Sequence, residues 1–237
     1  MADIGSGYGS ECHLLRYLGR HRQFFSKEVM AAVGADEIEW QDFHFDPEMP
    51  WGDGERGGLD FLPADHRLLP EWMTFWPRAG NAMSWDAVGR IRRGGQDEWL
   101  LVEAKANTKE LQGSCAALER GGRPLIEAAM ASTKKALGVA PSADWLNGYY
   151  QAANRIAVLQ FLCSRDVAAR LLFVYFLGDK NPAAICPIDQ SGWEPVIAAL
   201  DEHLGISGSH PRADRIHKLF IAARPGTGTD QRQPAVS

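Results

Sequence analysis

The sequence lacks the cysteine and histidine patterns of a structural metal site. Its four cysteines form no CxxC pair, and its seven histidines include no HExxH or HxH spacing. Zinc sites need such closely spaced ligands, and a disulfide framework needs regularly placed cysteine pairs. We therefore expect buried free thiols at Cys12, Cys115, Cys163 and Cys186.

Long apolar runs and a strong charge imbalance are also missing. No stretch approaches the roughly 18 apolar residues of a transmembrane helix, and the N-terminal MADIGSGYGSECH lacks the basic and apolar regions of a secretory signal. We expect a cytoplasmic protein without a membrane segment. The net charge of −5 disfavours tight, non-specific DNA binding. It leaves room for an enzyme with a local basic groove around an acidic metal site.

Apolar periodicity predicts an α/β protein. Helical spacing is seen over residues 13–33, with a break near Ser26, and further helices are expected over about 71–75, 124–137, 144–163 and 194–203. Strands are expected at 37–45, 84–91, 98–104, 169–179 and 215–223. The strand at 169–179 is apolar throughout and is typical of burial on both faces; for 215–223 a helix is the alternative. This order predicts a mixed central sheet flanked by helices.

The chain divides into a single domain with two loose ends. We expect a flexible N-terminus over 1–12, a domain over 13–223 with a loop-rich insertion at about 46–83, and a disordered tail over 224–237.

Two strand-forming runs, SWDAVGRI and EWLLVEA, lie on either side of the glycine pair 94–95. Glycine accepts the positive φ angles of a type I′ turn, so this pair is a good two-residue hairpin turn. With the turn at the tip, Arg93 faces Gln96, and counting back along both strands places Asp86 directly opposite Glu103. Cβ atoms in such a pair are about 5 Å apart. A longer turn or a bulge would shift this register.

Lys105 lies two residues beyond Glu103 and shares its face of the sheet, whereas Ala104 points into the other layer. Two carboxylates this close repel each other, and a divalent cation removes that cost by binding both. Mg²⁺ prefers one or two carboxylates with waters and phosphate oxygens, and a nearby lysine can position water and stabilise charge on a phosphate. The pattern favours phosphodiester hydrolysis; the alternative is a surface Glu–Lys pair at a sheet end.

Asp86 followed by Glu103-x-Lys105 at the end of an apolar strand resembles the PD-(D/E)xK nuclease superfamily. The segments WDAVG, LLVEAKA, YYQAANRIAVLQFL and LLFVYFLGD are also similar to an uncharacterised bacterial branch of it. The resemblance covers about 13–180 and implies a restriction-endonuclease-like fold, with a helix, three strands, helices and a further strand in that order. One departure is Trp85, which stands where the name-giving motif has proline.

The resemblance implies roles for the three central residues. Asp86 and Glu103 would bind Mg²⁺, for which Mn²⁺ can substitute, with help from the backbone carbonyl of Ala104. Lys105 would be the catalytic lysine.

Members of the superfamily often carry further polar groups at the site. An acid on the first helix is common; the candidate is Glu28, with Glu37 and Glu39 as rivals. A polar residue on the helix after the ExK strand is also common, and the candidate is Gln151, for which ordinary helix surface is the alternative. Three polar residues share one face of that helix and are expected to point at the site or the substrate: Gln151, Asn154 and Arg155.

The expected function is that of a Mg²⁺-dependent endonuclease acting on nucleic acid, with DNA favoured over RNA. The alternative is a catalytically silent nuclease-fold protein that serves as an interaction module in a defence or toxin-like system. The net acidity and the lack of a dominant basic segment motivate this second hypothesis. The sequence leaves the oligomeric state open, a homodimer included.

Overall fold

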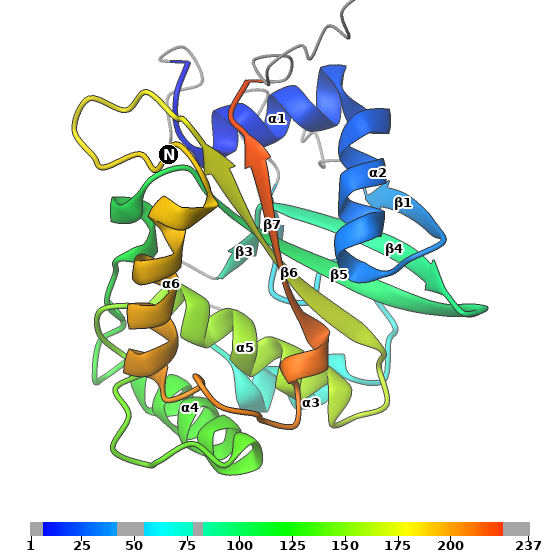
Figure 1. Cartoon of the computed structure of the whole chain (residues 1–237). Coiled ribbons are helices and arrows are strands. Elements are labelled where there is room, and N and C mark those ends of the chain that lie inside the picture. Colours follow the sequence, from blue (N-terminus) through cyan, green and yellow to red (C-terminus); the bar gives the residue numbers. More distant parts are fainter. Residues whose placement is uncertain (1–6, 42–54, 78–82, 225–237) are drawn as a thin grey trace, which may run out of the picture.

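A mixed five-stranded sheet runs through the centre of the molecule, with helices on both faces (Figure 1). The computed structural model describes residues 7–41, 55–77 and 83–224. In spatial order the strands are β1 (Glu37–Gln41), β4 (Ala87–Arg93), β5 (Gln96–Lys105), β6 (Ala169–Leu177) and β7 (Ile216–Ala222). The first three strands pair antiparallel, and β5, β6 and β7 run parallel. The α/β sheet flanked by helices is therefore confirmed.

The β4–β5 hairpin turns at Gly94 and Gly95, whose φ angles are 56° and 80°. A residue with a side chain rarely adopts such angles, which explains why glycine occupies both positions. Arg93 pairs with Gln96, as predicted from the sequence, and the register continues to the pair Ala87 and Val102.

Two helical layers cover the sheet. One layer holds α1 (Ser10–Arg20) and α2 (Arg22–Val33). The other holds α3 (Leu69–Phe75), α4 (Arg123–Leu137), α5 (Tyr150–Cys163) and α6 (Gln190–Leu204). Strand β6 separates two apolar cores, because its alternate residues pack into one and the other. It is buried on both faces, as its sequence predicts.

Several helix boundaries differ from the expectation. The break in the first helical region falls at His21 and not near Ser26, because His21 donates its N–H to Tyr17 at the end of α1 and accepts from Phe25 at the start of α2. The first helix begins at Ser10, inside the segment expected to be flexible.

The helix expected from residue 144 begins only at Tyr150. The Asp144 carboxylate accepts the N–H groups of Leu146 and Asn147, which makes a turn in place of helix.

Several expectations concern residues outside the described ranges. These are the end of the strand at 37–45, part of the insertion at 46–83 and nearly all of the tail at 224–237. Within the insertion, the described residues form α3 and the short strand β2 (Arg56–Gly57), which pairs with β3 (Ser84–Trp85). The described part of the chain also contains the short 3₁₀ helices η2 (Thr108–Leu111) and η3 (Ala213–Arg215).

Two further expectations can be checked against the described ranges. All four cysteines are free; Cys12 and Cys115 are buried, and Cys163 and Cys186 are half-buried. None of the described helices has the length and apolar character needed to cross a membrane.

A buried ion pair joins two neighbouring strands of the sheet. Arg170 on β6 donates from Nε to Glu98 on β5 at 2.7 Å, and both side chains are buried. The preceding residue on β5, Asp97, forms only exposed ion pairs with Arg90 and Arg92. The two acids are therefore adjacent in sequence, but the Glu98 side chain is buried and the Asp97 side chain is exposed.

This contrast predicts unequal effects on stability. Glu98→Ala would leave the Arg170 guanidinium buried without its carboxylate, so we expect a loss of about 3–5 kcal/mol in the free energy of unfolding. Asp97→Ala should cost about 1 kcal/mol or less, because water replaces its partners. Urea unfolding of both variants checks this, and equal losses would contradict it.

Candidate functional site

The C-terminal end of β5 places two charged side chains on one face of the sheet. Glu103 and Lys105 point toward α5, whereas Ala104 between them packs into the core under α1 and α2. This alternation follows from the two-residue period of a strand. It confirms that Lys105 shares the face of Glu103 and that Ala104 belongs to the other layer.

Asp86 lies where β4 leaves its partner. The β4–β5 ladder ends at Ala87 and Val102, because Trp85 belongs to β3 and pairs with Arg56. Backbone pairing therefore stops one residue short of the predicted opposition of Asp86 and Glu103. The Asp86 carboxylate instead accepts a hydrogen bond of 2.6 Å from the Ala104 N–H. If the strand pairing continued, a backbone carbonyl would accept from this N–H.

Glu103 is held by two cations. Lys105 donates from Nζ to its Oε1, and Arg155 donates from Nε to its Oε2 at 2.6 Å. The residues Glu103, Lys105 and Arg155 are 1%, 6% and 4% exposed, respectively, so these are buried ion pairs. Gln151 accepts a further hydrogen bond from Lys105 Nζ at 3.0 Å.

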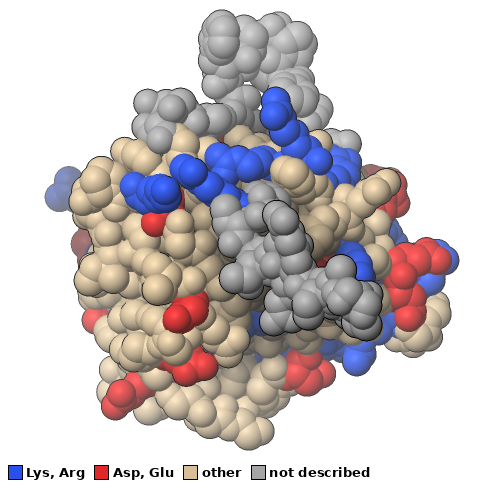
Figure 2. Space-filling view, turned by 45° about the horizontal axis from the view of Figure 1, so that its top comes forward, with Lys and Arg blue, Asp and Glu red and all other residues tan. Residues whose placement is uncertain are grey.

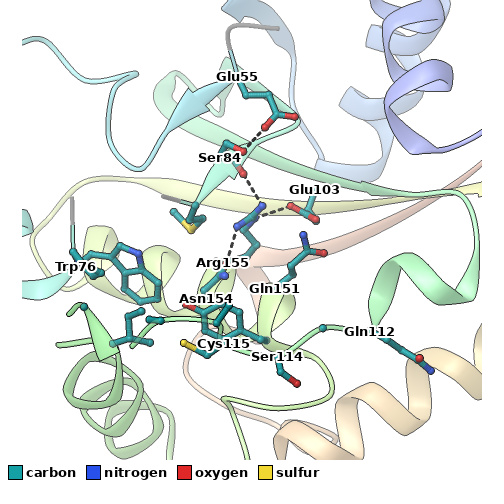
Figure 3. Close-up of a pocket in the computed structure, with 18 of the residues that line it drawn as sticks. Glu55, Trp76, Ser84, Glu103, Gln112, Ser114, Cys115, Gln151, Asn154 and Arg155 are labelled. Atoms are coloured by element: carbon teal, nitrogen blue, oxygen red, sulfur yellow. Dashed lines mark hydrogen bonds and ion pairs between the residues drawn. The ribbon is translucent and has the colours of Figure 1, made fainter. Parts of the chain in front are cut away.

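Arg155 connects α5 to strands β5 and β3 (Figure 3). Besides its bond to Glu103, it donates to Asn154 Oδ1 at 2.7 Å and to the Ser84 carbonyl at 2.5 Å. Its guanidinium also lies 5.1 Å from the centroid of the Trp85 ring. The helical face predicted from Gln151, Asn154 and Arg155 is therefore turned toward the site.

The environment separates the pKa values of the two carboxyl groups. Burial, and then the nearby charge of Glu103, raise the pKa of Asp86 to about 7. Burial alone would also raise the pKa of Glu103, but the charges of Arg155 and Lys105 outweigh it and lower that pKa. Burial would lower the pKa of Lys105, yet Glu103 and Asp86 raise it. Glu103 and Lys105 are thus charged at neutral pH, whereas the pKa of Asp86 lies near neutrality.

These groups face a pocket of about 900 Å³. Among its described lining residues, five carry carboxyl groups: Glu11, Glu55, Asp86, Glu103 and Glu110. Two carry positive charge: Lys105 and Arg155. A lining with this excess of carboxylates attracts cations.

The acids expected from the first helical region and from β1 lie away from this pocket. Glu28, on α2, does not line the pocket, and neither do its rivals Glu37 and Glu39 on β1. Glu11 on α1 does. The sequence did not indicate Glu11, because residues 1–12 were expected to be flexible. In the structure α1 already begins at Ser10, and the Gly9 N–H before it donates to the buried Asp179.

The donor set fits a hard divalent cation with few protein ligands. The described residues contain no group of three or more His, Cys, Asp or Glu side chains arranged for a metal ion. Mg²⁺ needs fewer, because it commonly takes one or two carboxylates and completes its shell with water and phosphate oxygens. The Ala104 N–H points to Asp86, and a strand residue's carbonyl points to the same side as its N–H, so the predicted carbonyl ligand faces Asp86 as well.

Searches of protein-family models, curated proteins and solved structures find no significant match to this chain.

The raised pKa of Asp86 makes the stability of the fold depend on pH. The folded chain binds the proton of the Asp86 carboxyl group more tightly than the unfolded chain does, because the pKa of Asp86 is 3.8 in the unfolded chain. The resulting stabilisation is present below about pH 4 and is lost as the pH rises through 7. We therefore expect Asp86→Asn, which keeps an acceptor for the Ala104 N–H, to lose less unfolding free energy than the wild type between about pH 5 and pH 8.5.

Urea unfolding without divalent metal measures this difference. The matched control is Asp65→Asn, which changes an exposed acid outside the pocket and should follow the wild type. Parallel pH dependences of Asp86→Asn and the wild type would contradict the effect.

Proposed function

We propose that this protein is a metal-dependent nuclease with a restriction-endonuclease-like fold. The observation that carries the proposal is the meeting of Asp86, Glu103 and Lys105 at one pocket with an excess of carboxyl groups. The order of elements supports it, because α2, β1, β4, β5, α5 and β6 follow the order of the PD-(D/E)xK core. Nucleic acid is the proposed substrate, with DNA favoured over RNA on the strength of that resemblance.

Asp86 and Glu103 would hold the metal ion, with the Ala104 carbonyl beside them. Mg²⁺ is the proposed ion, and Mn²⁺ can take its place. When bound, such an ion polarises a phosphoryl oxygen and lowers the pKa of a bound water. The excess of acidic groups around Asp86 supports this role, because a dication relieves their mutual repulsion.

Lys105 is the group that would act on the reacting atoms. Its ammonium is anchored by Glu103 and Gln151 and is charged at neutral pH. A positioned cation stabilises charge that develops on a phosphate, and it orients a water through its remaining donor. Gln151 fixes the direction of this ammonium and is a positioning residue.

The surroundings of the pocket suit a nucleotide chain. The lining also includes large apolar side chains, among them Trp76, Met83, Leu118 and Ile126. A nucleotide combines a charged phosphate with a flat base whose faces stack on aromatic and apolar side chains. Figure 2 shows a row of Lys and Arg side chains across the upper part of one face, at the end of the molecule where α1 lies in Figure 1. Such a row favours contact with a phosphate backbone.

A catalytically silent interaction module is the second candidate. It is favoured by the ion pairs of Glu103, since Lys105 and Arg155 already occupy both carboxylate oxygens. A melting temperature that ignores Mg²⁺ and Mn²⁺, with no cleavage of DNA or RNA, would favour this function over hydrolysis.

The nuclease proposal predicts cleavage of nucleic acid that requires Mg²⁺ or Mn²⁺ and stops when the metal is chelated. Asp86→Ala, Glu103→Ala and Lys105→Ala should each reduce the rate by about 10²–10⁴-fold, because each removes a metal ligand or the catalytic cation. A fluorescent single- and double-stranded DNA assay, with RNA in parallel, measures the rates.

Lys109→Ala is the matched control, since this lysine is exposed and lies outside the pocket. Its rate should equal that of the wild type. Circular dichroism would verify that each variant is folded. Full activity of a folded Lys105→Ala protein would overturn the assigned role.

A further inference from the structure

Arg155 occupies a position in which a metal ion would otherwise be expected. Its Nε lies 2.6 Å from Glu103 Oε2, one of the two carboxylates of the proposed site. Arginine keeps its charge at every physiological pH, and its planar fork holds a fixed direction. Two more hydrogen bonds, to Asn154 and to the Ser84 carbonyl, and the Trp85 ring hold the same guanidinium. Release of Glu103 would therefore break contacts on several sides at once.

The charges of the cluster limit what else can bind. Asp86 and Glu103 carry two negative charges when ionised, and Lys105 and Arg155 balance them. One divalent ion gives this partly buried cluster a net charge of two, which the surrounding acids and a substrate phosphate can offset. A second ion would add two more positive charges beside Lys105 and Arg155, at an electrostatic cost that burial increases.

We propose that Arg155 stands in for a second metal ion, so that the site takes a single divalent cation, the one proposed to be held by Asp86 and Glu103. The inference rests on the proposed function and adds the stoichiometry of its metal site. Lys105 does not play the same part, since its ammonium is shared with Gln151 and is the group proposed to act on the reacting atoms. Arg155 acts through Glu103 and is a positioning residue.

The experiment counts bound Mn²⁺ by equilibrium dialysis and titration calorimetry, without substrate. The full-length wild type should bind one ion per chain. Arg155→Met removes the charge at similar size, and we expect a second ion to bind or the first to bind at least about tenfold more tightly. Arg155→Lys keeps the charge and should bind one ion with affinity close to that of the wild type, even though it loses the fork geometry.

Two further variants make the result specific. Arg165→Met is the matched control, because this arginine follows α5, lies outside the pocket and should leave metal binding unchanged. Arg155→Gln is a second neutral variant in case Arg155→Met fails to fold, which circular dichroism would reveal.

The outcomes separate this inference from the proposed function. Two ions per wild-type chain, or unchanged binding by a folded neutral variant, would overturn the role of Arg155 and leave the nuclease proposal standing. No ion in the wild type but one in Arg155→Met would support Arg155 as the resident cation and overturn the proposed activity. No ion in either protein would overturn both.

Discussion

The buried carboxylate of Glu103 determines how three elements meet at the open end of the sheet. Burying an unpaired carboxylate costs several kcal/mol, so the fold has to bring cations to it. Lys105 comes from the same strand, but Arg155 comes from α5 and also reaches the Ser84 carbonyl on β3. The position of α5 against β5, and of β3 beside them, is thus tied to this one charge. Asp86, which follows β3 directly, is placed as a consequence.

A second buried ion pair in the same strand shows that burial alone does not make a site. Glu98 and Arg170 bond at 2.7 Å, much as Glu103 and Arg155 do at 2.6 Å. Glu98 is not among the residues that line the pocket of about 900 Å³, whereas Glu103 lines it together with further acids. The same chemistry therefore joins two strands at one end of β5, and at the other end it leaves charged groups open to a ligand.

The sequence predicted the parts of this site that depend on local periodicity. The glycine turn determined the register of the hairpin, and strand alternation put Glu103 and Lys105 on one face and Ala104 on the other. The same register predicted that Asp86 lies near Glu103 at the end of the hairpin, but the bond of Asp86 to the Ala104 N–H was not predictable. That bond exists because Trp85 pairs with Arg56, a contact between distant segments that no local pattern encodes.

The first helix and Arg155 illustrate the same limit. Glu11 was overlooked because its helix begins close to the N-terminus and is anchored there by a contact between Gly9 and Asp179, far away in the sequence. Helical spacing placed Arg155 on the right face of its helix, yet its partner Glu103 is 52 residues away. Spacing along a helix predicts which side chains point the same way, but the partners of these side chains depend on how the helix packs in the fold. The pKa values of Asp86 and Glu103 diverge for the same reason: burial acts to raise both values, but only Glu103 is bonded directly to Arg155. If a cation binds here as proposed, it would meet one carboxylate already ionised and another with a pKa near neutrality, so its binding at Asp86 would be coupled to proton release.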